Sequence, residues 1–204
     1  VVGERMWPEL QGINCYDMEQ SPPLKKQICT SRAFGGYVED YEGMREAVST
    51  YAGICAQELR EQGTFAASLM VFIHTNHFNE MHDQYAQNCV IKLPVSSNST
   101  PDIVKYALQA LKYIYREGYK YKKAGVIITE IQHAVQTNLF DTTDREKYAR
   151  LMKIVDKYNK GFISDKIRLA VQGSGRMEWR LKQERLSPRY TTQIKEVMRI
   201  NCRI

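Results

Sequence analysis

Two stretches with the apolar spacing of a helix, each flanked by strand-like stretches, constrain the fold of this chain most strongly. The first helix is predicted over residues 40–62, where Gly63 is placed to end it. Its apolar positions recur at helical spacing: Met44, Val48, Tyr51, Cys55 and Leu59. A second helix is predicted from a Thr100 cap and Pro101 to Gly118. Its apolar side comprises Ile103, Ala107, Leu111 and Ile114.

Four strands are predicted around these helices. They cover residues 26–31, 65–73, 89–93 and 120–131, and alternation is clearest in the second. The order is therefore β-α-β-β-α-β. This order predicts an α+β, ferredoxin-like unit in which two helices cover one face of a four-stranded antiparallel sheet and leave the other face free.

A smaller C-terminal module is predicted after residue 143. Residues 145–159 form a helix with one apolar stripe, for which residues 141–144 supply N-cap chemistry. The stripe comprises Tyr148, Leu151, Ile154, Val155 and Tyr158. Residues 167–171 are expected to form a short strand, so this module is also expected to be α+β.

The composition describes an ordinary globular protein of 204 residues with 43% apolar and 25% charged residues. No apolar run approaches the roughly 20 residues of a membrane span, and no signal peptide opens the chain, so a cytoplasmic location is expected. The odd number of scattered cysteines favours reduced thiols over disulfides or zinc (Cys15, Cys29, Cys55, Cys89 and Cys202). Because the sequence begins at Val1, we expect a fragment of a longer protein.

The net charge of +6 is unevenly distributed along the chain. Residues 1–20 carry −3, residues 21–135 carry +1 and residues 136–204 carry +8. A basic C-terminal part favours an acidic partner, nucleic acid first, although many lysines only solvate a surface.

A candidate docking peptide lies between the two predicted units, at Gln136-Thr137-Asn138-Leu139-Phe140. In extended conformation the amide of Gln136 can donate and accept hydrogen bonds, while Leu139 and Phe140 fill a pocket on another protein. Peptides that bind sliding clamps work in this way. The alternative is that both apolar side chains pack against a neighbouring core.

Several stretches together resemble the C-terminal half of Y-family translesion DNA polymerases of the UmuC type. Arg5, Glu9-Leu10, Gly12 and Cys15 are similar to the end of the thumb, and residues 26–34 and 121–126 to the first and last strands of the little finger. Residues 136–140 fall where the family carries its clamp-binding peptide, and residues 186–192 resemble its closing motif. Thr137 departs from the leucine that is more usual there.

The resemblance implies four regions and a binding role. The regions are a thumb remnant at 1–20, a DNA-binding little finger at 21–133, a clamp-binding linker at 134–143 and a basic module at 144–204. The family's catalytic palm, which holds two Mg²⁺ ions, is not in this sequence. The fragment is therefore expected to need no cofactor and not to polymerise DNA alone. Implied partners are primer-template DNA and the sliding clamp, with a UmuD-like accessory subunit and a recombinase filament.

By the same resemblance, the free face of the sheet grips DNA phosphates without reading sequence. That role requires cations and short hydroxyl donors. The candidates are Lys26, Ser31, Arg32, Thr75, Lys92, Lys122 and Lys123. Because Lys122 and Lys123 are adjacent in a strand, only one of them is expected to contact DNA fully. The alternative is that these lysines are solvated edge residues.

Other functions fit the sequence less well. His74, His77 and His82, with Glu80, Asp83 and Cys89 nearby, match no standard zinc spacing, so we predict a polar loop without metal. An RNA-recognition motif shares the element order, but its stacking aromatics are missing from residues 89–93. A nucleophile elbow, a phosphate loop and a dinucleotide fingerprint are missing from the sequence. The remaining alternative is a stand-alone ferredoxin-like module that binds nucleic acid or protein.

Overall fold

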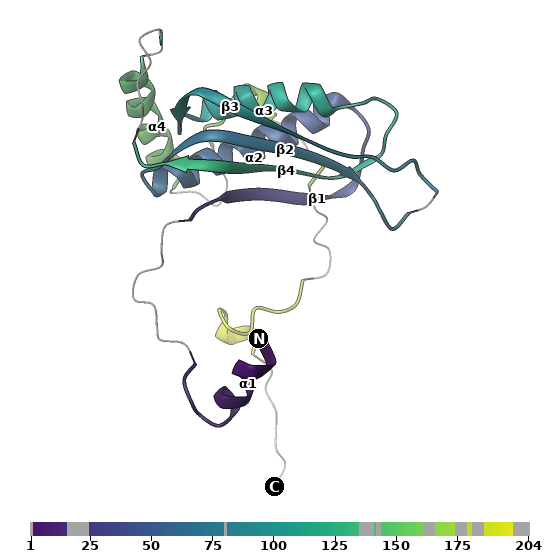
Figure 1. The fold of residues 1–204 in the computed structure, drawn as a ribbon, viewed down its shortest axis with the longest axis vertical. Helices are drawn as coiled ribbons and strands as arrows, with labels where there is room; N and C mark the ends of the chain where they lie inside the picture. The colour runs from purple at the N-terminus through teal and green to yellow at the C-terminus, as the bar shows by residue number, and fades with distance from the viewer. Residues whose placement is uncertain are drawn as a thin grey trace.

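The computed structural model describes residues 2–15, 25–79, 81–134, 141, 144–160, 166–173, 179, 180 and 186–197. Its central part, residues 28–132, has the predicted β-α-β-β-α-β order (Figure 1). We call this part the sheet unit. Its elements are β1 (Ile28–Val38), α2 (Tyr41–Glu61), β2 (Phe65–Thr75), β3 (Ala86–Ser97), α3 (Thr100–Ile114) and β4 (Tyr121–Gln132).

The four strands form one antiparallel sheet in the order β1-β4-β2-β3, so β2 and β4 are central and β1 and β3 lie at the edges. Both edge strands are longer than their sequence patterns predict. In β1 the register shifts between Ala33 and Val38, which breaks the alternation. At its start, β3 is polar because an edge strand pairs through its backbone with β2 and faces solvent there.

Local chemistry explains where the helices begin and end. The carboxylate of Asp40 accepts a hydrogen bond from the backbone N–H of Gly43 and caps α2. Gly63, at φ +68°, follows its end in a backbone conformation that glycine adopts without strain. The N-cap of α3 is Ser99 rather than Thr100, which is the first helical residue. Pro101 lies in the first turn as predicted.

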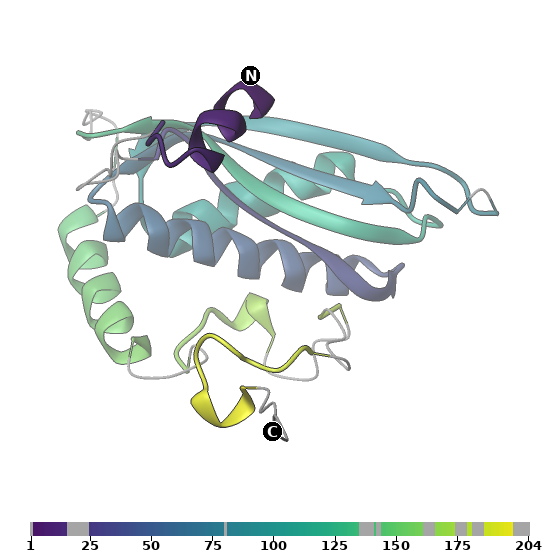
Figure 2. The same ribbon diagram turned by 90° about the horizontal axis from the view of Figure 1, so that it is seen from below.

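Helices α2 and α3 pack on the same face of the sheet (Figure 2). The core between the two layers is apolar and fully buried, with Leu59 from α2, Ile73 from β2 and Leu111 from α3 at 0% exposure. At roughly 25 cal/mol per Å² of apolar area, this burial is the main stabilising contribution to the unit. The described residues place no helix on the opposite face of the sheet, which is the free face.

The C-terminal part begins with α4 (Arg145–Asn159), whose predicted bounds are confirmed and whose N-cap is Asp144. The predicted apolar stripe is not its packing side. Met152 is the buried residue of α4, whereas Leu151, Ile154 and Tyr158 are exposed. The side of α4 that packs on α2 instead carries Met152 and Asp156, and its contact with Arg60 is polar.

The predicted strand at 167–171 is wrong. The structure has a short 3₁₀ turn, η1 (Ala170–Gln172), packed on α2. Gln172 accepts from the N–H of Leu169 and donates to the carbonyl of Ser49, while the hydroxyl of Ser49 donates to the carbonyl of Val171. These bonds give the segment polar partners on α2 in place of a neighbouring strand. The described residues of 144–204 thus contain helix and 3₁₀ turns but no strand.

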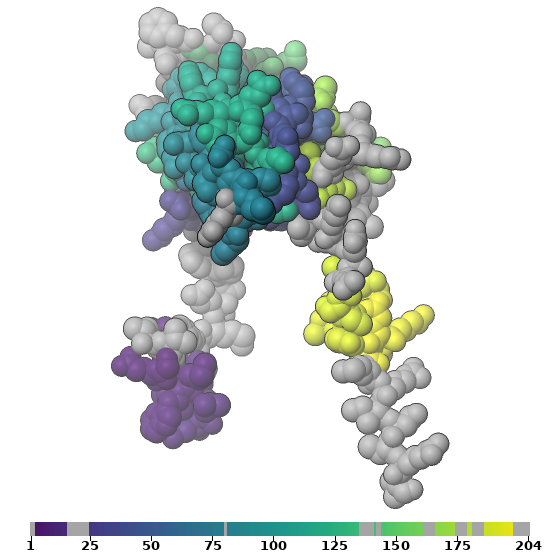
Figure 3. Space-filling model, turned by 90° about the vertical axis from the view of Figure 1, so that its right-hand side faces the viewer, coloured from purple at the N-terminus to yellow at the C-terminus, as the bar shows by residue number. Residues whose placement is uncertain are grey.

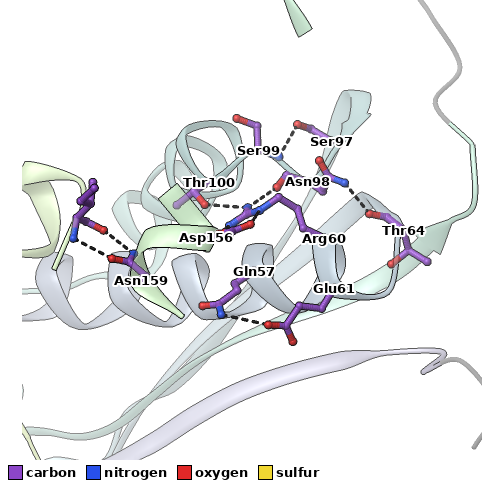
Figure 4. Close-up of polar contacts among 11 residues, drawn as sticks. Gln57, Arg60, Glu61, Thr64, Ser97, Asn98, Ser99, Thr100, Asp156 and Asn159 are labelled. Atoms are coloured by element: carbon purple, nitrogen blue, oxygen red, sulfur yellow. Dashed lines mark hydrogen bonds and ion pairs between the residues drawn. The ribbon is translucent and has the colours of Figure 1, made fainter. Parts of the chain in front are cut away.

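Arg60 of α2 holds α4 in place (Figure 4). Its Nε and Nη2 donate to the two carboxylate oxygens of Asp156, at 2.6 and 2.7 Å. Its Nη1 donates to the carbonyl of Asn98 at 2.7 Å and to the hydroxyl of Thr100 at 3.0 Å. A planar guanidinium suits this forked arrangement. One side chain therefore ties α2, the start of α3 and α4 together.

Two further described segments lie clear of the sheet unit (Figure 3). They are the N-terminal helix α1 (Val2–Leu10) and residues 186–197, which contain the 3₁₀ turn η2 (Ile194–Glu196). Among the described residues, no helix combines the length and apolar character that crossing a bilayer requires.

Candidate nucleic-acid interface

The free face of the sheet consists of cross-strand rows of side chains. One row is apolar and joins Cys29, Ile127, Met70 and Val90. The next joins Ser31, Gly125, Phe72 and Asn88, and a third joins Ala33, Lys123, His74 and Ala86. The centre of this face is therefore apolar and half-buried, while its polar and cationic groups lie to one side of that centre and at its edges.

Three predicted contacts lie on this face. Ser31 is half-buried beside Gly125, and Lys123 is exposed and pairs with His74. Lys92 lies on edge strand β3, exposed, with its Nζ 3.9 Å from a carboxylate oxygen of Glu130. An exposed pair at that distance is weak, so Lys92 can exchange Glu130 for a phosphate at little cost.

Two predicted contacts do not lie on the free face. Thr75 is 4% exposed on the helix-covered face, where its hydroxyl bonds to Gln84 and to the backbone of Tyr85. Arg32 pairs with the inward-facing Ala124 at the edge of the sheet, on the side of α2. Burial raises the pKa of Tyr51 in α2 to about 12, and the positive charge of Arg32 acts in the opposite direction. Alternation between Thr30 and Phe34, both buried, places Arg32 there.

The other two predicted cations, Lys122 and Lys26, lie at the margin of the free face. The ammonium of Lys122 lies 5.5 Å from the ring centre of Tyr37, within cation–π range, while its neighbour Lys123 is on the free face. Lys26 is exposed just before β1. The register thus makes Ser31 and Lys123 diagonal neighbours on adjacent strands, whereas Lys92 lies at the level of Glu130, toward the other end of the sheet.

The sequence reading missed the central side chains of this face. Phe72 lies against Gly125, where an added Cβ would sit 2.5 Å from both Phe72 Cζ and Ser31 Cβ, so glycine is required. His74 lies 5.1 Å from the Phe72 ring, and burial lowers its pKa, as do the charges of His77 and Lys123. The signal was present, because inward Leu69, Val71 and Ile73 force the residues between them outward.

The free face does carry an aromatic side chain on a central strand. Residues 89–93, which have none, lie in edge strand β3, whereas the central strand β2 carries Phe72 on the free face. The ring is half-buried and lies next to two cationic or polar groups, Lys123 and His74. One aromatic side chain is therefore available to a base or a sugar.

The histidine loop between β2 and β3 is held together by side-chain hydrogen bonds to backbone. Gln84 donates to the carbonyls of Asn76, Asn79 and His82. The rings of His74 and His77 meet edge to face at 5.7 Å. Glu80 lies outside the described residues, and among those described no three His, Cys, Asp or Glu side chains form a metal-binding group.

The predicted docking residues Gln136, Leu139 and Phe140 lie outside the described residues. Both flanks of the segment are described. Before it, Gln132 in β4 pairs with Phe65. After it, Arg145 bonds to the side chain of Asp141 and, at 3.5 Å, to the carbonyl of Ser96. These two flanks therefore lie beside the same end of the sheet.

Fold and surface together define a sheet-based domain with one covered and one free face, joined to a helical C-terminal segment. The model of the impB/mucB/samB family C-terminal domain matches residues 25–139, and a domain of unknown function matches residues 149–200. The first match covers more than half of the chain. The chain belongs to the impB/mucB/samB family.

Curated relatives show similarity along almost the whole chain. Protein UmuC of Salmonella typhimurium is 36% identical over 203 residues, which cover 98% of this chain and 48% of that protein. Protein ImpB of Salmonella typhimurium is 35% identical, covering 97% and 47%. Protein MucB of Escherichia coli is 34% identical, also covering 97% and 47%. The chain spans about half the length of the curated relatives it matches.

Proposed function

We propose that this chain is the DNA-gripping and clamp-docking part of an error-prone translesion DNA polymerase of the DNA-damage (SOS) response. Membership of the impB/mucB/samB family and similarity to UmuC support this proposal. In it, residues 1–20 end the thumb, 21–133 form the little finger, 134–143 form the clamp-binding linker and 144–204 form a basic module. The sheet unit lies within the second region.

Side chains on the free face of the sheet support the proposed DNA binding. Ser31 offers a short hydroxyl donor and Lys123 a cation on neighbouring strands, and Lys92 adds a second cation at the far edge. Their spread across the sheet suits successive phosphates of one duplex, and phosphate contacts position DNA without reading its sequence. A grip that ignores sequence suits an enzyme that copies damaged templates.

Two variants that each remove one positive charge test the proposed DNA binding. Lys123→Gln removes a cation from the free face, and Arg32→Gln removes one from the helix side of the same sheet. Lys123→Gln is expected to weaken binding to duplexes of any sequence and to lower the salt slope of log K by about 0.9, the value for one phosphate contact. Arg32→Gln is expected to leave the slope unchanged. Equal slopes for both variants in fluorescence anisotropy titrations reject this face.

A second candidate use of the same face is base stacking, which Phe72 on the central strand favours. Stacking on an aromatic ring is worth about 1–3 kcal/mol per base in single-stranded complexes. Phe72→Leu keeps the apolar contact but removes the stacking surface. If this variant loses single-strand affinity and keeps duplex affinity, stacking replaces the phosphate grip as the role of this face.

For the linker, we propose docking to the sliding clamp through Gln136, Leu139 and Phe140. Its support is the residue pattern and its place between the sheet unit and α4. Tethering raises the local concentration of a weak DNA binder at the primer end. Leu139→Ala/Phe140→Ala is expected to weaken clamp binding about tenfold or more, as loss of interface anchors does. Tyr113→Ala, which changes an exposed aromatic of α3, is the matched control. Equal affinities of the two variants reject clamp docking.

The parent activity is part of the same proposal. In the parent protein, a palm domain that precedes this region would hold two Mg²⁺ ions for nucleotidyl transfer. The parent acts in the cytoplasm, with a UmuD-like subunit and a recombinase filament as partners. Primer extension by the longer protein, and none by this chain, is the expected result. Extension by this chain alone contradicts the division of labour.

A further inference from the structure

The outward surface of α4 carries two parallel stripes of different chemistry. Leu151, Ile154 and Tyr158 are 47%, 66% and 52% exposed and share the i, i+3, i+7 spacing of one helix side. Arg150, Lys153 and Lys157 repeat that spacing one residue earlier and are also exposed. Exposed Leu151 and Ile154 beside three cations form an unusual surface for a helix that is already packed.

The rotational setting of α4 keeps these stripes outward. Met152 is buried on the inward side, and Asp156, one turn later, receives the fork of Arg60 (Figure 4). Turning the helix to bury Ile154 would break that ion pair and leave both charges without partners in a partly buried position. The exposed stripe is therefore a fixed, preorganised surface.

The apolar stripe continues into a groove at the side of α4. The groove has a volume of about 210 Å³, and its apolar lining includes Leu151, Val155, Ile167, Leu169 and Pro101. Arg60 and Arg168 are among its polar lining residues. A partner side chain can enter the groove while the rest of the partner lies along the stripe.

Charge decides which partner fits. Residues 160–204 of this chain contain eleven basic and four acidic residues, so the C-terminal segment would be repelled by the basic stripe. A nucleic acid would use the cations but has no need of Leu151 and Ile154. We propose that the outward surface of α4 binds an acidic amphipathic helix of a partner protein, with apolar anchors on Leu151 and Ile154 and carboxylates on the basic stripe.

A synthetic probe tests this surface in the full chain. The probe is a helical peptide of about 18 residues, slightly longer than the 15 residues of α4, with leucines at i, i+3, i+7 and glutamates on one flank. Leu151→Ser/Ile154→Ser is expected to weaken its binding about tenfold. Phe78→Ser, which removes a 98% exposed aromatic from the β2–β3 loop, is the matched control and is expected to bind normally. Circular dichroism checks that the variants fold.

A charge swap separates recognition from a structural effect. Arg150→Glu/Lys153→Glu/Lys157→Glu is expected to reject the glutamate peptide and to bind a lysine version of it, with affinity recovered to within about tenfold. Failure of this rescue overturns the proposal. The proposal is also overturned if this charge-swap variant loses duplex DNA binding but keeps binding of the glutamate peptide, because the surface is then a nucleic-acid contact. Self-association that Leu151→Ser/Ile154→Ser abolishes makes a second copy the occupant and also overturns it.

Discussion

The sheet unit and α4 are held by different forces. In the sheet unit, Leu59, Ile73 and Leu111 are fully buried between two layers, so water is excluded along the whole interface. In α4, one side chain is buried, Met152, and the helix is positioned by the bonds between Arg60 and Asp156. Apolar burial is non-directional and large, whereas a polar junction is directional and contributes little net free energy.

This contrast explains why the two regions suit different tasks. A dense core makes the sheet a rigid support for a face that grips a ligand. A helix held by few contacts opens locally at a lower free energy than the whole domain does. Its position is set by charge geometry, which leaves its apolar side chains available to a partner.

Leu111→Ala removes a fully buried side chain of α3. It is expected to lower the free energy of unfolding by about 2–5 kcal/mol, because a cavity remains in a close-packed core. Urea unfolding followed by circular dichroism measures the change. Unfolding of the core is expected to release α4 as well, since α4 rests on α2 and α3, whereas α4 can also open alone. A loss below about 1 kcal/mol would contradict a tightly packed core.

Arg60→Met removes the junction and leaves the core intact. The Asp156 carboxylate then lacks its partner, and since the two side chains are 13% and 28% exposed, we expect a loss of about 1–3 kcal/mol. Amide hydrogen exchange is expected to quicken in α4 and to stay unchanged in β2 and β4.

The double variant Arg60→Met/Asp156→Met is the control for this junction. It removes both charges and replaces them with apolar side chains, so part of the protection of α4 is expected to return. Equal protection of α4 in the wild type and in Arg60→Met would show that α4 is held by other contacts.

Alkaline pH is expected to lower the free energy of unfolding of the sheet unit. Burial raises the pKa of Cys55 to about 11 and those of Tyr51 and Tyr121 to about 12. Raised folded-state values favour the neutral forms, so stability is complete below the unfolded values, 9.0 for Cys and 10.0 for Tyr, and falls as pH rises toward 12. Denaturant midpoints measured across this range are expected to fall.

Tyr51→Phe sharpens this pH test. The hydroxyl of Tyr51 is buried and has no hydrogen-bond partner among the described residues, so its removal costs little at neutral pH. The variant is expected to show a shallower decline above pH 10 than the wild type. An identical decline would assign the alkaline sensitivity to other groups.

The aspartate N-caps of α2 and α4 allow the most direct comparison of the two regions, with the smallest expected effect. Asp40 accepts from Gly43 in α2, and Asp144 accepts from Lys147 in α4. Each change to alanine is expected to cost about 1 kcal/mol. Asp40→Ala should lower global stability, whereas Asp144→Ala should only speed amide exchange in the first turn of α4. Equal global losses would indicate that α4 unfolds together with the core.

Local patterns in the sequence suffice to predict the order of the elements and most of their bounds. Helical periodicity located α2, α3 and α4, because repeats of three and four residues are local. Alternation located the central strands and also indicates that Ser31 and Lys123 face away from the helices. The same alternation indicates Phe72 and His74, which a search for cations and hydroxyls passed over.

Long-range contacts alone set the strand order, the burial of Thr75 and the 3₁₀ turn at Ala170–Gln172. The bond between Arg60 and Asp156 spans 96 positions, and no local pattern encodes it. It turned the apolar stripe of α4, which by periodicity should face the core, outward to solvent. Periodicity fixes which residues share a side of a helix, whereas long-range contacts choose the side that is buried.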